Sequence, residues 1–126
     1  MPAQSIAELL ASRCRPVPPG GAMGIDAIHK QLEALPEWRY DDGSIVRTYR
    51  FRNYYETIAF VNAIAYIAHR EDHHPDLLVG YNRCTVKFST HSADGVSRND
   101  FISAAKCDAV FGVELGQTAS PSVSGA

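Results

Sequence analysis

The chain has 126 residues, of which 45% are hydrophobic and 21% charged, enough apolar content for a single domain with a core. Its 12 basic and 14 acidic side chains give a net charge of -2, so composition provides no electrostatic reason to expect nucleic acid or an anionic membrane as a partner. Cys14, Cys84 and Cys107 are far apart and odd in number, which favours reduced thiols in a cytoplasmic protein.

The N-terminal residues predict an extension that precedes the folded domain. Residues 5–14 have the pattern of a short helix, and the stretch RPVPPGGAMG that follows contains three prolines and three glycines, which disfavour regular structure. We therefore expect an extension and linker over residues 1–23, a folded domain over 24–113 and a small, polar tail over 114–126. Deletion of residues 1–22 is accordingly expected to leave folding intact.

A helix and a hairpin are predicted to open the domain. Ile25, Ile28, Leu32 and Leu35 recur at spacings of three and four, which is typical of one face of a helix that ends before Pro36. In EWRYDDGSIVRTYRF, two strand-like runs flank an Asp-Gly dipeptide, which is a strong hairpin signal.

A long helix is predicted next, from about Tyr54 to about Asp72. Asn53 and Glu56 resemble the first and last residues of a capping box. The middle of the helix, from Ile58 to Ala68, is apolar on nearly every side. We expect it to be buried on more than one face, with one face against a sheet and another against a second subunit.

Two strands and a last helix complete the predicted order. Residues 77–82 and 84–90 are strand-like, and Ser97 to Asp100 form a capping box that would begin a helix running through Phe101 and Val110. The order helix-β-β-helix-β-β-helix predicts an α+β domain in which helices pack on one face of a four-stranded antiparallel sheet.

Four of the five histidines, His69, His73, His74 and His91, fall within residues 69 to 91. His69 and His73 would share a helix face, but Glu71 is misplaced for a metal-binding HExxH motif and no cysteine is close in sequence, so we expect no metal site. Proton transfer is an alternative, because imidazole changes charge near cellular pH. A solvated helix end without chemistry is a third interpretation, and capping alone would explain Asp100.

The stretch DHHPDLLVGYNRCTVKFSTHSADGVSRND resembles the pterin-4a-carbinolamine dehydratase family. The signature is a His-His-Pro triplet, an aromatic residue, a histidine and an aspartate at fixed spacings, matched here by His73-His74-Pro75, Tyr81, His91 and Asp100. LEALPEWRY is similar to the family's beginning, and the resemblance extends from about Ile25 to Phe111.

This resemblance implies helices against a four-stranded antiparallel sheet, a homodimer or homotetramer, and dehydration of 4a-hydroxytetrahydrobiopterin to quinonoid dihydropterin. That reaction recycles the cofactor of aromatic amino acid hydroxylases, one of which is a candidate partner, and it needs no bound cofactor or metal. His73, His74 and His91 would be catalytic and Asp100 would support them. We expect the substrate to contact Asp72, His69, Pro75, Ser89 and Thr90.

Two positions depart from the family. His69 replaces an acid that many members carry, although Asp72 is nearby, and Leu77 replaces a tryptophan of some members.

Relatives that act as dimerisation cofactors of a transcription factor, or that assist the assembly of larger enzymes, leave a non-catalytic role as the alternative.

Overall fold

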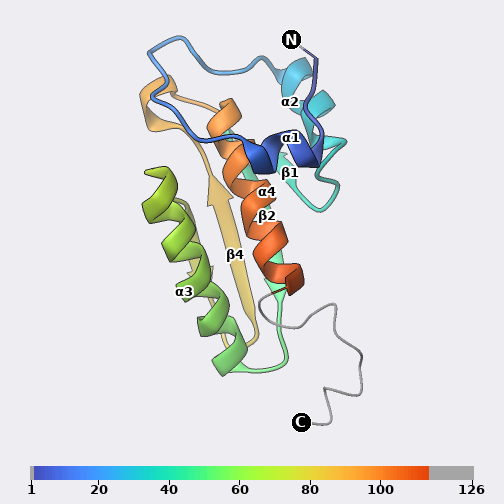
Figure 1. The fold of residues 1–126 in the computed structure, drawn as a ribbon, viewed down its shortest axis with the longest axis vertical. Helices are drawn as coiled ribbons and strands as arrows, with labels where there is room; N and C mark the ends of the chain where they lie inside the picture. Colours follow the sequence, from blue (N-terminus) through green and yellow to red (C-terminus); the bar gives the residue numbers. More distant parts are fainter. Residues whose placement is uncertain (1, 114–126) are drawn as a thin grey trace.

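The computed structural model describes residues 2–113, so the predicted tail over 114–126 lies outside the described residues (Figure 1). In chain order the elements are α1 (Ile6–Ala11), α2 (Ile25–Leu32), β1 (Arg39–Asp41), β2 (Ser44–Arg50), α3 (Tyr54–Glu71), β3 (Asp76–Val79), β4 (Arg83–Phe88), the 3-10 helix η1 (His91–Ala93) and α4 (Arg98–Val113). From α2 onward this is the predicted order, with η1 added between β4 and α4.

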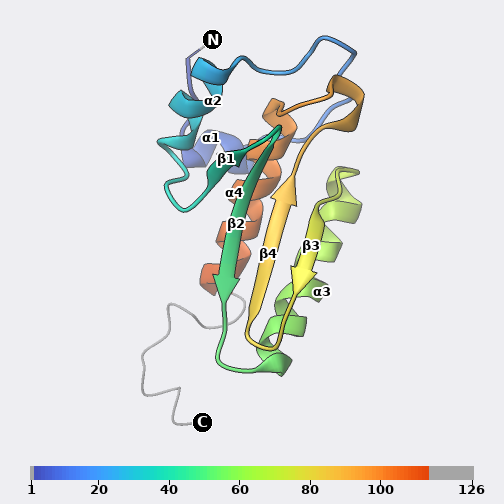
Figure 2. The same cartoon turned by 180° about the vertical axis from the view of Figure 1, so that it is seen from behind.

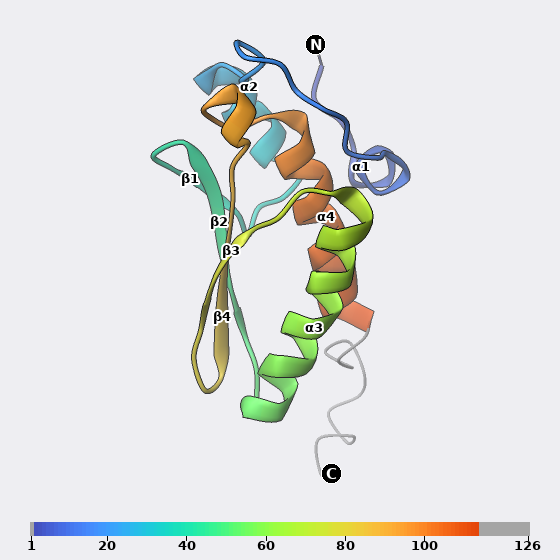
Figure 3. The same ribbon diagram turned by 90° about the vertical axis from the view of Figure 1, so that its left-hand side faces the viewer.

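The four strands form one antiparallel sheet in the order β1-β2-β4-β3. Figure 2 shows the open face of this sheet, and Figure 3 shows α3 and α4 side by side on its other face. The predicted α+β architecture is therefore confirmed. The central strand β4 carries Cys84, Val86 and Phe88 inward, as its alternating sequence requires.

The β1–β2 hairpin turns at Asp42 and Gly43, as the sequence predicts. Both residues have positive φ angles, 45° and 86°, which two-residue hairpin turns of this kind need. The register that follows pairs Ile45 with Phe88 across β2 and β4 and places Tyr49, which is 0% exposed, in the core.

Helix α3 begins at its expected cap, because the Asn53 side chain accepts a hydrogen bond from the Glu56 backbone N–H at 2.9 Å. Its inner face buries Phe60, Ile64 and Ala68. Burial on more than one face was predicted, but within the single chain Tyr66 on the outer side is 61% exposed. Among residues 2–113, no segment covers Tyr66 on this outer side.

The N-terminal segment is packed, contrary to the prediction of a linker over residues 1–23. Helix α1 lies on α4, on the side away from the sheet (Figures 1 and 3), and its Leu9 is 0% exposed within the hydrophobic core. Ser5 and Glu8 cap α1 reciprocally. The segment after α1 then leads to Gly24, the N-cap of α2. Because Leu9 belongs to this core, we expect deletion of residues 1–22 to lower stability, whereas the sequence alone predicts an intact fold.

Candidate functional site

A cavity of about 490 Å³ lies between the C-terminal end of α3, the end of β4 and the start of α4. It gathers most of the residues that the sequence singles out. The predicted residues lining it are Asp72, His73, His74, Pro75, Ser89, Thr90 and His91. Three imidazoles from two separate segments therefore open on one space.

Asp72 determines where the first imidazole lies. It ends α3 with φ 52° and ψ 43°, the left-handed conformation that aspartate tolerates better than most residues. The chain turns sharply there, and the His73 backbone N–H still donates to the Ala68 carbonyl at 3.2 Å. The His73 side chain is thereby directed back toward the start of α4.

His73 is paired with a buried carboxylate. Its Nε2 lies 2.5 Å from Oδ1 of Asp100, a residue that is 0% exposed. The imidazole also stacks on Phe88, with ring centroids 5.9 Å apart and an interplanar angle of 8°. An acceptor on one side and an aromatic face on the other fix both the position and the plane of the ring.

The Asp100 carboxylate is itself held by two groups. Its Oδ2 accepts hydrogen bonds from the Ser97 backbone N–H at 2.8 Å and from the Thr90 hydroxyl at 2.9 Å. The Thr90 and Ser97 hydroxyl oxygens are 2.6 Å apart, which closes the network. Capping explains one oxygen of Asp100, as the sequence suggests, and His73 occupies the other.

This arrangement gives His73 a definite chemistry. A carboxylate oxygen accepts, so Nε2 carries a hydrogen and Nδ1 is left to accept a proton or a hydrogen bond. The carboxylate also stabilises the imidazolium that forms when Nδ1 is protonated. A histidine that lines a cavity and is held by a buried aspartate is therefore able to act as a general base.

His74 and His91 are more exposed than His73. Both line the cavity, and both are exposed to solvent. His74 precedes Pro75, which favours extended backbone and separates its side chain from that of His73. His91 begins η1, and Ser89 and Thr90 separate it from the end of β4 at Phe88. Exposed imidazoles at the mouth of a cavity are free to exchange protons with water.

His69, Tyr81 and the buried Asp100 were singled out from the sequence but do not line this cavity. His69, a predicted substrate contact, is exposed on α3 and does not line it, so that prediction is not supported by the geometry. Tyr81, which belongs to the family signature, is 63% exposed and stacks with Tyr54 at a centroid distance of 6.5 Å. The signature spacing therefore includes a residue remote from the imidazoles.

The structure adds lining residues that the sequence did not predict. They are Cys14, Arg15, Pro16, Val17, Glu71, Asp76, Ser92 and Asn99. The first four belong to the N-terminal segment, which was expected to be a linker. The Ser5–Glu8 capping box predicts a helix there, but local pattern carries no information about a docking site more than fifty residues away.

The described residues provide neither a ready metal site nor a membrane span. Within residues 2–113, no three histidine, cysteine, aspartate or glutamate side chains come together in a way that could hold a metal ion. In the same residues, no helix combines the length and apolar character needed to cross a bilayer.

Comparison with protein families gives one matching model over most of the chain. The model for pterin 4 alpha carbinolamine dehydratase matches residues 22–110. A Nitrosomonas europaea protein with the provisional name pterin-4-alpha-carbinolamine dehydratase is 48% identical over 111 residues, covering 85% of this chain and 96% of its own length. A Bdellovibrio bacteriovorus protein with the same provisional name is 51% identical over 109 residues, covering 83% of this chain and 89% of its own.

Two solved structures are similar in fold. A transcriptional coactivator/pterin dehydratase from Brucella melitensis has a TM-score of 0.70 and 31% identity, with 72% of this chain and 99% of that chain covered. A pterin dehydratase-like protein described as a RuBisCO assembly factor of the alpha-carboxysome has a TM-score of 0.51 and 20% identity, with 60% of this chain and 87% of that chain covered, a likeness of fold alone.

Proposed function

Since this chain belongs to the pterin 4 alpha carbinolamine dehydratase family, we propose that it dehydrates 4a-hydroxytetrahydrobiopterin to quinonoid dihydropterin by histidine acid–base catalysis. The observation that carries the proposal is the His73–Asp100 pair beside His74 and His91 in one cavity. A non-catalytic relative would have no need to hold a titratable ring on a fully buried carboxylate.

The reaction asks for one acid and one base. The C4a–O bond breaks, and the hydroxyl must be protonated before it can leave as water. The neighbouring ring N–H loses its proton as the C=N bond forms, so the two proton transfers balance and no electrons are exchanged. Imidazole suits both steps, because each protonation state exists near neutral pH.

We assign the roles from position. His74 delivers the proton to the leaving hydroxyl, because it is exposed and is reprotonated readily by solvent. His73 is positioned by Asp100 and, with His91, orients the ring and accepts the other proton. Asp72, Pro75, Ser89 and Thr90 provide the surrounding contacts to the pterin.

The proposal includes a biological setting. The product returns to the cofactor cycle of an aromatic amino acid hydroxylase in the cytoplasm, with that hydroxylase as a candidate partner. The alternative is a role as dimerisation cofactor or assembly scaffold; a pterin dehydratase-like protein of similar fold is described as a RuBisCO assembly factor. The site favours the enzyme, because a scaffold function places no demand on the imidazoles.

A single assay tests the proposal. Chemically generated 4a-hydroxytetrahydropterin is mixed with purified protein, and quinonoid dihydropterin formation is followed by absorbance against the spontaneous rate. We expect acceleration that is proportional to enzyme concentration. Matched rates with and without protein would leave the scaffold role as the better account.

We also propose a homodimer or homotetramer. Large apolar side chains are exposed on α3 and along the edge strand β3, among them Tyr55 at 82%, Tyr66 at 61% and Leu78 at 65%. An edge strand has unpaired backbone groups that a second copy can pair with. Size-exclusion chromatography with light scattering should give at least twice the chain's 13.8 kDa. A monomer at micromolar concentration would contradict this proposal.

A further inference from the structure

Residues 13–17, which we call the strap, form one side of the catalytic cavity. Four of them, Cys14, Arg15, Pro16 and Val17, line the same space as the three imidazoles. The strap has no helical or strand structure of its own. Its position is therefore set by the side chains to which it is bonded.

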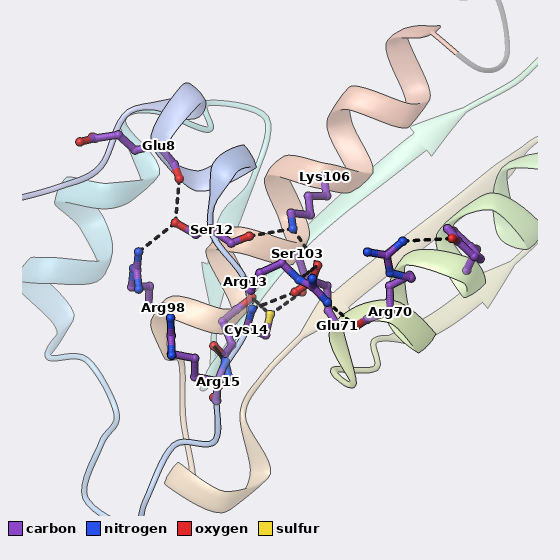
Figure 4. Close-up of polar contacts among 12 residues, drawn as sticks. Glu8, Ser12, Arg13, Cys14, Arg15, Arg70, Glu71, Arg98, Ser103 and Lys106 are labelled. Carbon is purple, nitrogen blue, oxygen red and sulfur yellow. Dashed lines mark hydrogen bonds and ion pairs between the residues drawn. The ribbon is translucent and has the colours of Figure 1, made fainter.

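Its first anchor is Glu71, whose side chain is only 4% exposed. One oxygen of this carboxylate accepts from the Cys14 backbone N–H at 2.8 Å. The other accepts from Arg13 Nε at 3.1 Å and from Lys106 Nζ at 2.7 Å (Figure 4). Burial alone would raise the pKa of the Glu71 carboxyl, but these donors lower it to about 2. The anchor is thus ionised at neutral pH.

The second anchor is Asn99, which binds the strap backbone at two points. Its Oδ1 accepts from the Arg15 N–H at 3.0 Å, and its Nδ2 donates to the Arg15 carbonyl at 2.6 Å. The third anchor is Ser92, whose hydroxyl donates to the Val17 carbonyl at 2.6 Å. Both polar groups of the Arg15 backbone and the end of the strap are thereby fixed.

Each anchor is a near neighbour of a residue of the imidazole site. Glu71 precedes His73 by two positions, Ser92 follows His91, and Asn99 precedes Asp100. The strap is accordingly tied to the same short segments that position the imidazoles. A substrate that fills the cavity lies between the imidazoles and the strap.

The strap lies outside the region that the family model matches. That model begins at residue 22, beyond the strap, and its region contains the three histidines and Asp100.

We propose that the strap is a built-in wall of the pterin site that governs substrate affinity without taking part in proton transfer. The inference rests on the proposed function. Pro16 and Val17 offer apolar contacts suited to a flat bicyclic ring. Burial raises the pKa of the Cys14 thiol to about 11, and a guanidinium stays protonated, so no strap side chain exchanges protons near neutral pH. The strap is therefore able to bind but not to act as an acid or base.

The test compares two neighbouring substitutions. Asn99→Ala removes both bonds to Arg15, whereas Arg98→Ala removes bonds to Gln4 and Ser12, upstream of the strap and away from the cavity. We expect Asn99→Ala to raise KM about tenfold, in line with two lost hydrogen bonds, and to leave kcat and its pH profile unchanged. Arg98→Ala should leave both constants unchanged. Ser92→Ala, at an exposed anchor, should raise KM by a smaller factor.

Two further measurements do not depend on turnover. The dissociation constant of 7,8-dihydrobiopterin, a reduced pterin without the 4a-hydroxyl, should rise with KM in Asn99→Ala. In the wild type, saturating 7,8-dihydrobiopterin should slow amide hydrogen exchange in a peptide that covers residues 13–17. The Cys14 and Arg15 amides are direct reporters, because each donates to an anchor side chain.

The outcomes separate the two proposals. If Asn99→Ala leaves KM and the dissociation constant unchanged, and 7,8-dihydrobiopterin leaves hydrogen exchange in the strap unchanged, the strap is not a wall of the pterin site. A fall in kcat at constant KM would also overturn the proposal, because it would indicate a catalytic effect. A wild type that binds 7,8-dihydrobiopterin but does not dehydrate refutes the proposed reaction, while binding and exchange still decide on the strap. Absence of pterin binding by the wild type refutes both.

Discussion

Two carboxylates on the same helix, Asp100 and Asp108, have opposite uses. Asp100, in the first turn of α4, accepts from Ser97, Thr90 and His73. Asp108, eight positions later, accepts from Trp38 Nε1 at 3.0 Å, from Arg47 Nη1 at 2.9 Å and from the Tyr49 hydroxyl. Each carboxylate receives several donors, and both connect α4 to other segments of the fold.

The difference lies in which donors can change their protonation. Arg47 stays charged, an indole N–H does not ionise in this range, and burial beside Asp108 raises the pKa of Tyr49. The partners of Asp108 therefore never exchange protons near neutral pH, and the cluster fastens α4 to the sheet. Asp100 instead accepts a hydrogen bond from the imidazole of His73, which lines a cavity. A buried carboxylate becomes functional through the partner it holds.

The largest expected effect concerns His74, the proposed acid, which lines the same cavity as His73. His74→Ala should lower kcat by about 10² to 10⁴, the usual contribution of one positioned acid or base, because the leaving hydroxyl loses its proton donor. The fold should persist, since His74 is exposed. Steady-state kinetics and circular dichroism check both points.

The same experiment separates acid–base catalysis from metal catalysis. A His74→Ala/His91→Ala double variant should lose less than the product of the two single effects, because residues that act together are not additive. EDTA should leave the wild-type rate unchanged. Activity that is lost to EDTA and restored by zinc would refute histidine acid–base catalysis.

The next largest effect is expected from a change of Asp100 itself. Asp100→Asn keeps the shape of the side chain but removes the charge that stabilises the His73 imidazolium. We expect kcat to fall by about 10², with the pH profile altered. An unchanged rate and profile would mean that Asp100 serves the helix cap alone.

Asp108→Asn is the matched change at the other end. It removes the ion pair with Arg47, whose side chain is 16% exposed, and weakens the Tyr49 bond. We expect the free energy of unfolding to fall by about 1–3 kcal/mol, with the rate per folded molecule unchanged. Urea denaturation and kinetics measure the two quantities. A loss of kcat without a loss of stability would contradict the contrast drawn between Asp108 and Asp100.

The smallest effect is acid sensitivity at a third carboxylate joined to α4, that of Glu71. Its pKa is about 2 in the fold against an ordinary 4.5, so its contribution to stability is complete above pH 4.5 and is lost as the pH falls toward 2. The stability difference between wild type and Glu71→Gln should therefore shrink over that range. A constant difference from pH 6 to pH 2.5 would show that the charge is irrelevant.

Local signals predicted most of the fold. The Asp42-Gly43 turn, the Asn53 cap and the Ser97–Asp100 box each act within a few residues, and each lies where the sequence places it. Hydrophobic alternation gave β4 its inner face. Such features could be read because the physical cause lies within the same short stretch.

The site was predicted only in part, for a physical reason. The sequence spacing singles out His73, His74 and His91, and in the fold all three line one cavity. The position of Asp72 in left-handed conformation and the docking of Cys14 and Arg15 depend on tertiary contacts. Proline and glycine in the N-terminal stretch indicate irregular backbone, which is compatible with both a free linker and an anchored strap.

The anchored strap also constrains the order of folding. Its two bonds to Asn99 join positions 84 residues apart in sequence. On the ribosome, residues 13–17 emerge early, and their partners on α4 follow only after nearly all of the domain has been synthesised. Closing such a long loop is entropically costly until the intervening sheet has formed. The strap is therefore expected to dock last. During refolding, the native sheet should form before the strap amides become protected from hydrogen exchange.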